Sequence, residues 1–146
     1  MNFICAIMDW LRRVGVHCTF EFSEGFAYDM DRNVLVIGVN EMPNVKAFEQ
    51  MLYEYGMEYI DIYAPVLGFL HELGHYATVR SFNEFELMIC HFIKENSDDC
   101  VDYWEVADEF SANMWEIDFI NNCPQYVEEL CDIYYKYWND FIERRV

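Results

Sequence analysis

The segment over residues 65–80 constrains the fold of this chain more than any other. Pro65 suits the first turn of a helix, and residues 66–70 read V-L-G-F-L, an uninterrupted apolar run. Residues 71–75 follow directly and read H-E-L-G-H. A helix that is apolar on every side is stable only when other elements cover it. We therefore expect a buried helix here, with ionisable side chains in its second half.

The periodicity of the other segments predicts an α+β fold. Residues 17–22 alternate as in a strand, and residues 33–39 (N-V-L-V-I-G-V) are typical of a buried strand that pairs with residues 26–30 as a hairpin. Helices are predicted over residues 3–14, 43–55, 65–80, 83–95 and 100–121, and from Pro124 onwards. We expect a small antiparallel sheet near the N-terminus followed by a helical bundle, in one domain over residues 1–146.

The charge of the chain excludes several kinds of partner. Asp and Glu number 27 against 9 Lys and Arg, which gives a net charge of −18 at pH 7. A surface of that sign repels phosphate backbones and anionic lipids, so we expect neither nucleic acid nor a membrane as a partner. No apolar run approaches the roughly 18 residues of a membrane-spanning helix.

The cysteines and the N-terminal segment indicate a cytoplasmic protein. None of the 6 cysteines forms a C-x-x-C pair, so a thiolate zinc ribbon has no support. The N-terminal segment has no basic start and carries Asp9 within its apolar stretch, unlike a secretory signal peptide. We expect reduced, mostly buried cysteines in the cytoplasm.

The H-E-L-G-H sequence matches the pattern H-E-x-x-H. Four residues advance a helix by about 400°, so His71 and His75 lie on one face, where both imidazoles can bind one Zn²⁺. Glu72 lies about 100° round the helix from His71, within reach of a water molecule activated by the metal. The alternative interpretation is a pair of ordinary histidines on an ordinary helix.

The stretch P-V-L-G-F-L-H-E-L-G-H-Y-A resembles the active-site helix of the zincin metallopeptidases. Metzincins continue as H-E-x-x-H-x-x-G-x-x-H, but Ser81 occupies the position of the last histidine. Gluzincins take a glutamate from a later helix, in patterns such as E-x-x-A-N, which residues 109–113 (E-F-S-A-N) match. The resemblance, closest to the minimal single-domain ImmA/IrrE-like group, implies Glu109 as the third zinc ligand and Asn113 as a partner that orients a ligand histidine.

Two other third ligands remain open. Glu105 would share a helix face with Glu109, on which these carboxylates could equally be solvated. His91 lies at about the distance found in some DNA–protein crosslink proteases, but it falls within a predicted helix and the acidic charge opposes binding to DNA.

The resemblance implies a zinc-dependent metallopeptidase with one Zn²⁺ per chain and Glu72 as general base. The substrate would be a protein or peptide, bound in extended form against an edge strand, for which we nominate residues 34–39. Tyr76 and Tyr103 lie near the motifs as oxyanion donors, and neither is assigned. The alternative is a catalytically silent zinc-binding interaction module that keeps the fold, against which the intact Glu72 argues.

Overall fold

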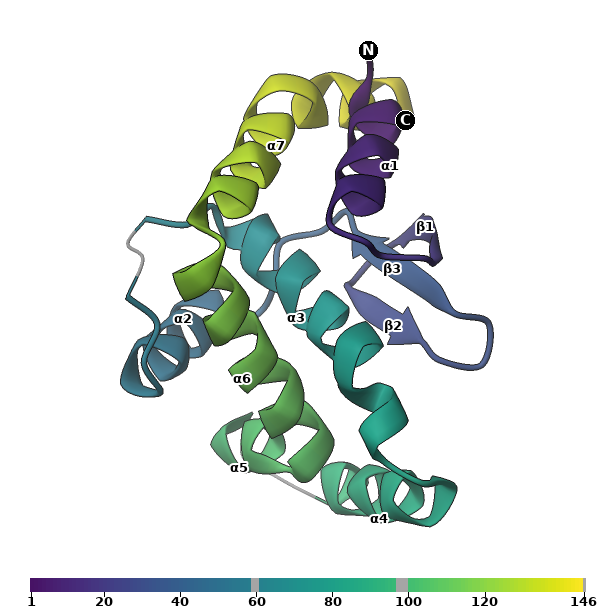
Figure 1. Cartoon of the computed structure of the whole chain (residues 1–146), viewed down its shortest axis with the longest axis vertical. Helices are drawn as coiled ribbons and strands as arrows, with labels where there is room; N and C mark the ends of the chain where they lie inside the picture. The colour runs from purple at the N-terminus through teal and green to yellow at the C-terminus, as the bar shows by residue number, and fades with distance from the viewer. Residues whose placement is uncertain (59–60, 97–99, 146) are drawn as a thin grey trace.

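The computed structural model describes residues 1–58, 61–96 and 100–145, and it has the expected α+β fold (Figure 1). A three-stranded sheet lies near the N-terminus, and helices make up most of the rest of the described chain. The elements are α1 (Phe3–Arg13), β1 (Thr19–Ser23), β2 (Ala27–Asp29), β3 (Val34–Gly38), α2 (Val45–Glu54), α3 (Ala64–Thr78), the 3₁₀ turn η1 (Val79–Ser81), α4 (Glu84–Glu95), α5 (Cys100–Glu105), α6 (Ala107–Asn122) and α7 (Pro124–Arg145).

The sheet is mixed, so the prediction of an antiparallel sheet is only half right. β2 and β3 form the expected antiparallel hairpin, but β1 pairs with β3 in parallel, which gives the order β1-β3-β2. Every residue of β3 is buried, whereas the residues of β1 alternate between exposed and half-buried. A strand that is apolar on both faces belongs at the centre of a sheet. The nomination of residues 34–39 as an edge strand for substrate is therefore wrong, and β2 is the edge strand on that side.

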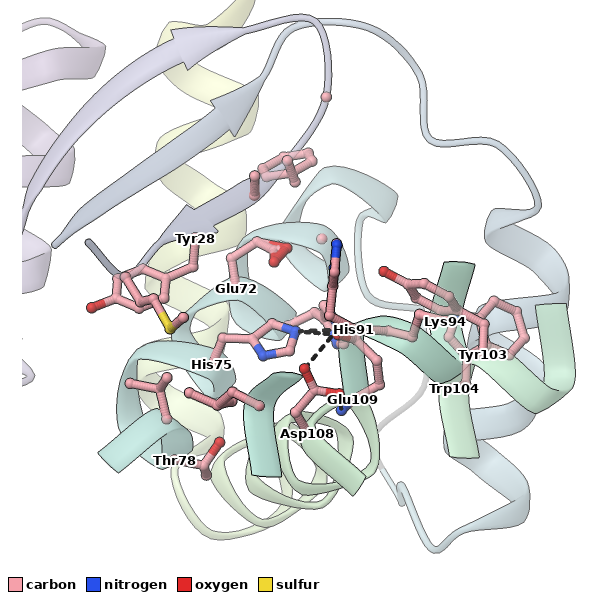
Figure 2. Close-up of a pocket in the computed structure, with 18 of the residues that line it drawn as sticks. Tyr28, Glu72, His75, Thr78, His91, Lys94, Tyr103, Trp104, Asp108 and Glu109 are labelled. Carbon is pink, nitrogen blue, oxygen red and sulfur yellow. Dashed lines mark hydrogen bonds and ion pairs between the residues drawn. The ribbon is translucent and has the colours of Figure 1, made fainter. Parts of the chain in front are cut away.

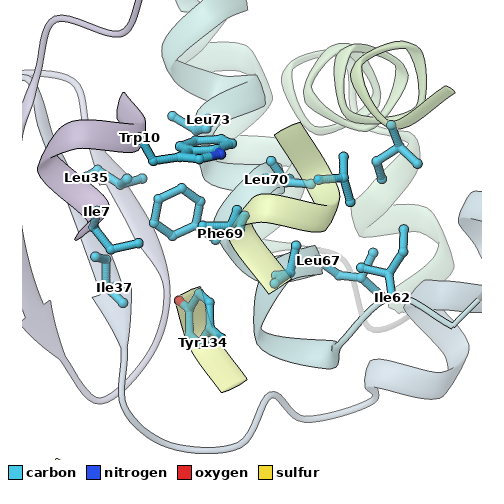
Figure 3. Close-up of a cluster of buried hydrophobic side chains, with 14 of the residues drawn as sticks. Ile7, Trp10, Leu35, Ile37, Ile62, Leu67, Phe69, Leu70, Leu73 and Tyr134 are labelled. Atoms are coloured by element: carbon cyan, nitrogen blue, oxygen red, sulfur yellow. The ribbon is translucent and has the colours of Figure 1, made fainter. Parts of the chain in front are cut away.

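Helix α3 lies at the centre of the fold, between the sheet and α6 (Figure 1). Its apolar residues Leu67, Phe69 and Leu70 are fully buried, as the sequence predicts for this helix. Figure 3 shows Phe69 between Trp10 of α1 and Tyr134 of α7, and its ring centroid lies 5.7 Å from that of Trp10. Each such side chain contributes about 1.5–3 kcal/mol on full burial. The core thus fixes the position of α3 within the fold.

A glycine lets α6 approach α3 closely. A Cβ atom at Gly74 would lie 2.5 Å from the carbonyl oxygen of Ala112 and 2.9 Å from its Cα atom. Ala112 itself is fully buried. Because both residues are small, the backbones of the two helices meet at this point, directly beside the H-E-x-x-H motif.

The helix predicted over residues 100–121 is interrupted. The backbone of Val106 is extended, with φ −62° and ψ 141°, and separates α5 from α6. No proline or glycine marks this break, so the apolar periodicity could not reveal it. Helix α6 consequently has an N-terminus of its own, with Asp108 and Glu109 in its first turn, where the helix dipole stabilises carboxylates.

Helix α4 has the predicted amphipathic pattern but turns its apolar face outward. Phe85, Met88 and Phe92 are 64%, 61% and 66% exposed, whereas Cys90 on the same helix is buried. Nothing in the described part of the chain covers this face. None of the helices in the described ranges combines the length and apolar composition needed to cross a membrane.

Candidate metal centre

Three of the predicted ligands converge between α3 and α6. The carboxylate oxygen Oε1 of Glu109 lies 2.9 Å from Nε2 of His71 and 3.1 Å from Nε2 of His75. Figure 2 shows His75, Glu72 and Glu109 at the floor of one cleft. The structure therefore brings together residues from two segments that the sequence linked only through a motif.

The spacing of these atoms suits a metal ion. In a tetrahedral zinc site with bonds of roughly 2.0–2.1 Å, the ligand atoms lie about 3.3 Å apart. The observed separations of 2.9 and 3.1 Å need only a small outward movement to reach that value. His71, Glu72 and His75 also form a group whose ligand atoms lie within 4.8 Å of one another. These residues could hold a metal ion.

Asn113 lies where the resemblance implies an orienting partner. Its side-chain oxygen Oδ1 is 2.8 Å from Nδ1 of His71, and the residue is fully buried. An amide oxygen accepts from a ring N–H, so Nδ1 carries the proton and Nε2 is left for a metal. The amide nitrogen of Asn113 donates in turn to the carbonyl of Trp104, 3.4 Å away at the end of α5. The break in the helix thus supplies a partner for Asn113.

Lys94 and Asp108 complete the centre, and the sequence did not point to either. The ammonium of Lys94 donates to Oδ2 of Asp108 over 2.7 Å and to Oε2 of Glu109 over 2.9 Å. Lys94 comes from α4, and its side chain is only 17% exposed. Asp108 could have been considered as a site residue because it precedes Glu109, but no sequence pattern around Lys94 indicates that Lys94 belongs to the site.

The centre is strongly polarised. Burial lowers the pKa of His71, but the hydrogen bond to Glu109 and the nearby carboxylates outweigh it and raise this pKa to about 9. Burial raises the pKa of Glu109, but hydrogen bonds from His71 and His75 hold it well below its usual range. In the metal-free protein, therefore, an ionised Glu109 faces a protonated His71.

Two other carboxyl groups of the centre behave in the opposite way. Burial raises the pKa of Glu72, against the opposing charges of the two histidines. Burial also raises the pKa of Glu116 well above its usual value, and neither of its carboxyl oxygens has a hydrogen-bond partner in the described structure. Glu116 follows Glu109 and Asn113 at helical spacing, so sequence reasoning could place it on their face but could not show that the face is buried.

The structure separates the competing third ligands from the centre. Glu105 lies on α5 and is exposed, and its carboxylate accepts from the hydroxyl of Tyr55 over 3.4 Å. The His91 side chain lines the cleft but is 71% exposed, and it pairs with Glu95 of the same helix. Of the three candidates, only Glu109 meets His71 and His75.

The two tyrosines near the motifs also differ in position. The hydroxyl of Tyr76 accepts the backbone N–H of His17 over 2.9 Å, an interaction with the segment before β1. Tyr103 lines the cleft, and Lys94 lies 5.5 Å from the centre of its ring. Burial and the charge of Glu109 raise the pKa of Tyr103 to about 12, so its hydroxyl is a proton donor at neutral pH.

The cleft above the centre is large and mixed in character. Its volume is about 1300 Å³, and it is lined by the metal-site residues together with apolar side chains from β2, α2, α4 and the segments just before β2 and α2. Phe26, Met42, Phe48 and Met88 are among the latter. Residues of the β2 edge strand form one of its walls, next to His75. Such a cleft has room for several residues of an extended polymer.

The fold and the site define an α+β protein with a candidate His–His–Glu metal centre in an open cleft. Comparison with protein-family models, with curated proteins and with solved structures gives no match to this chain. Its function therefore has to be inferred from the geometry of the centre.

Proposed function

We propose that this protein is a zinc-dependent metallopeptidase. The observation that carries the proposal is the convergence of His71, His75 and Glu109 on one point, with Glu72 beside it in a cleft. Glu72 occupies the position of the general base in the H-E-x-x-H pattern, directly after the first histidine.

The chemistry of the donors favours zinc. Two imidazoles and one carboxylate are a ligand set of catalytic zinc sites, which keep a further position for water or substrate. Among the described residues, none of the side chains grouped around the centre is a thiolate, so the donor set does not select copper(I) or an iron–sulfur cluster. When bound here, one Zn²⁺ per chain would supply a Lewis acid that polarises a carbonyl group and lowers the pKa of water.

Side chains of the protein would position the ligands and transfer the proton. Asn113 orients His71, and Glu109 balances part of the metal charge. The carboxylate of Glu72 accepts a proton from water and then donates it to the leaving nitrogen of the peptide bond. Because burial raises its pKa, Glu72 is a stronger base than an exposed glutamate, which suits both steps.

The cleft is compatible with an extended peptide. Its wall includes Ala27 and Tyr28 of β2, and a substrate strand could add to this edge of the sheet. The apolar residues on the other walls would receive side chains of the substrate. We accordingly expect a protein or peptide substrate, and β2 replaces residues 34–39 as its docking strand.

The described cysteines are compatible with a cytoplasmic location. Five of them, Cys5, Cys18, Cys90, Cys123 and Cys131, are free. Unpaired thiols persist in reducing compartments. We therefore propose that the enzyme acts in the cytoplasm.

Metal analysis tests the centre directly. Protein purified without added metal and then supplied with Zn²⁺ should contain about one zinc ion per chain by plasma mass spectrometry. Glu109→Ala should lose the zinc, whereas Glu105→Ala and His91→Ala, which alter the competing candidates, should keep it. A wild-type protein that binds no zinc would refute the proposal.

A glutamine substitution then separates an enzyme from a silent module. Glu72→Gln keeps the shape of the side chain but removes the base, so the variant should retain zinc and lose peptide hydrolysis by at least about 100-fold. The assay is the cleavage of a mixture of peptides, followed by mass spectrometry. A wild-type protein that binds zinc but cleaves none of them would instead favour the zinc-binding interaction module.

A further inference from the structure

The centre holds more metal-ligating groups than an open site needs. Besides the group around His71, ligand atoms of His75, Asp108 and Glu109 lie within 4.8 Å of one another. Asp108 is thus close enough to become a fourth protein ligand. Zinc with four protein ligands is a closed, structural site, whereas a catalytic zinc needs a free position.

Both carboxylate oxygens of Asp108 are already engaged. Oδ2 accepts from the ammonium of Lys94 over 2.7 Å, and Oδ1 accepts from the backbone N–H of Glu109 over 2.8 Å. The same ammonium donates to Oε2 of Glu109 over 2.9 Å. Lys94 therefore lies between the two carboxylates, in the kind of position that a cation shared by them would take (Figure 2).

We propose that Lys94 is a built-in cation that keeps Asp108 off the metal, so that one coordination position stays open. The inference rests on the proposed metal centre and deepens it, because it names the residue that makes the site catalytic instead of structural. Lys94 acts through Asp108 and Glu109, and it is a positioning residue in this role.

The physical basis is competition between two cations for the same carboxylate. The Lys94 and Asp108 side chains are 17% and 13% exposed, so water screens their ion pair only weakly. Charge-assisted hydrogen bonds of this kind are about twice as strong as neutral ones. Without Lys94, two adjacent carboxylates would face each other in a half-buried site, and the metal would be the nearest cation able to neutralise both.

The interaction of Lys94 with Glu109 has a second effect. Oε2 of Glu109 accepts from the ammonium over 2.9 Å and also lies 3.0 Å from Nε2 of His75, whereas the oxygen 2.9 Å from Nε2 of His71 is Oε1. A carboxylate oxygen that already accepts from an ammonium is a weaker ligand for a metal cation. Lys94 thus favours Oε1 over Oε2 as the oxygen of Glu109 that binds the metal.

Cobalt substitution reads the coordination directly. Co²⁺ replaces zinc, and acetohydroxamate, a small chelating ligand, shifts the visible absorption of the bound cobalt only when it can reach an open position. The full-length wild-type protein should respond. Lys94→Met, which keeps an unbranched side chain without charge, should need at least about tenfold more acetohydroxamate for the same shift.

The double variant Lys94→Met/Asp108→Asn supplies the decisive control. An asparagine does not compete for the metal as a carboxylate does, so the double variant should recover the wild-type response. Asp108→Asn alone should also respond like wild type, because Asp108 does not bind the metal while Lys94 is present. Near-ultraviolet circular dichroism verifies that each variant is folded.

Several outcomes would overturn the inference. A wild-type response in Lys94→Met would show that Asp108 stays off the metal without the help of Lys94. A response that is lost and not recovered in the double variant means that Lys94 acts by another route. Two cobalt ions per chain in Lys94→Met would contradict a single open site. Loss of cobalt in Asp108→Asn would also contradict it, because Asp108 would then be a metal ligand in the wild type. The Asp108→Asn result can be read even if Lys94→Met does not fold. A wild-type protein that binds no metal defeats the proposed function instead.

Discussion

The close approach of α3 and α6 at Gly74 can be tested with one methyl group. In Gly74→Ala, the new Cβ atom would lie 2.5 Å from the carbonyl oxygen of Ala112 and 2.9 Å from its Cα atom. Because these are backbone atoms, no side-chain rotation relieves the contact. The helices have to separate, and the separation moves His71 and His75 away from Glu109.

The magnitude follows from two opposing terms. Overpacking a well-packed core costs about 1–3 kcal/mol. Replacing glycine by alanine inside a helix returns about 1 kcal/mol through helix propensity. We expect a net loss of up to about 2 kcal/mol in the free energy of unfolding, together with a fall in zinc affinity of at least about tenfold.

Urea denaturation measures the stability, and competition with a chromophoric chelator measures the zinc affinity. The matched control is Gly68→Ala in the same helix, whose new methyl group would meet the side chains of Met42 and Phe26. Those side chains can shift, so Gly68→Ala should lose less stability and less zinc affinity. Ala112→Gly should not rescue Gly74→Ala, because the contact is with the backbone. Full stability and full zinc affinity in Gly74→Ala would refute the close-packing argument.

Three further predictions concern the titration and the burial of single residues. The pKa of His71 is raised to about 9 in the metal-free protein, and zinc binds only its neutral form. Zinc affinity should therefore rise by about tenfold per pH unit from pH 7 towards pH 9 and then level off. A chelator titration that gives a flat profile would contradict the pairing of His71 with Glu109. In the metal-free protein the stabilisation by protonated His71 is complete below pH 6.5, its unfolded value, and is lost as the pH rises through about 9. Burial raises the pKa of Glu116, so the wild type loses stability as the pH rises above 4.5, where this glutamate ionises in the unfolded chain. Glu116→Gln does not lose this stability, so urea denaturation should show the variant gaining on the wild type as the pH rises from 4.5. A difference that does not change with pH would mean that the pKa of Glu116 is not raised in the fold. Phe92→Ala on the exposed face of α4 should change the free energy of unfolding by less than about 0.5 kcal/mol, whereas Phe69→Ala in the core should lower it by about 3–5 kcal/mol. Similar losses in both variants would contradict the exposure of the apolar face of α4.

The sequence predicted the elements of this fold better than their arrangement. The apolar run at residues 66–70 indicated a buried helix, and α3 is buried as expected. The strand at residues 33–39 was found, but its place between two neighbours was not, because the apolar pattern of one strand does not determine which strand pairs with it. The break at Val106 was missed because it has no local signal.

The residues of the centre also differ in whether the sequence predicted them. His71, His75, Glu109 and Asn113 lie within two short motifs, so their spacing along a helix was enough to propose them. Lys94 joins the site from α4, a third helix whose apolar periodicity says nothing about which residue faces the cleft. Contacts between helices depend on how the helices pack, and that is decided by the whole chain.

The carboxyl groups of the centre show why residue type alone does not define such a site. Glu109 and Glu116 lie on one face of α6, and both are buried. Glu109 has the ring nitrogens of two histidines and the ammonium of Lys94 as partners, so it is ionised without a metal. Glu116 has no hydrogen-bond partner among the described residues, and burial raises its pKa well above the usual value. The pKa values of two glutamates on the same helix face are therefore shifted in opposite directions, because only Glu109 has hydrogen-bond partners, among them the two histidines. An ionised ligand held in place before the metal arrives needs only a small rearrangement to bind it, and such preorganisation is what a metal-dependent catalyst requires.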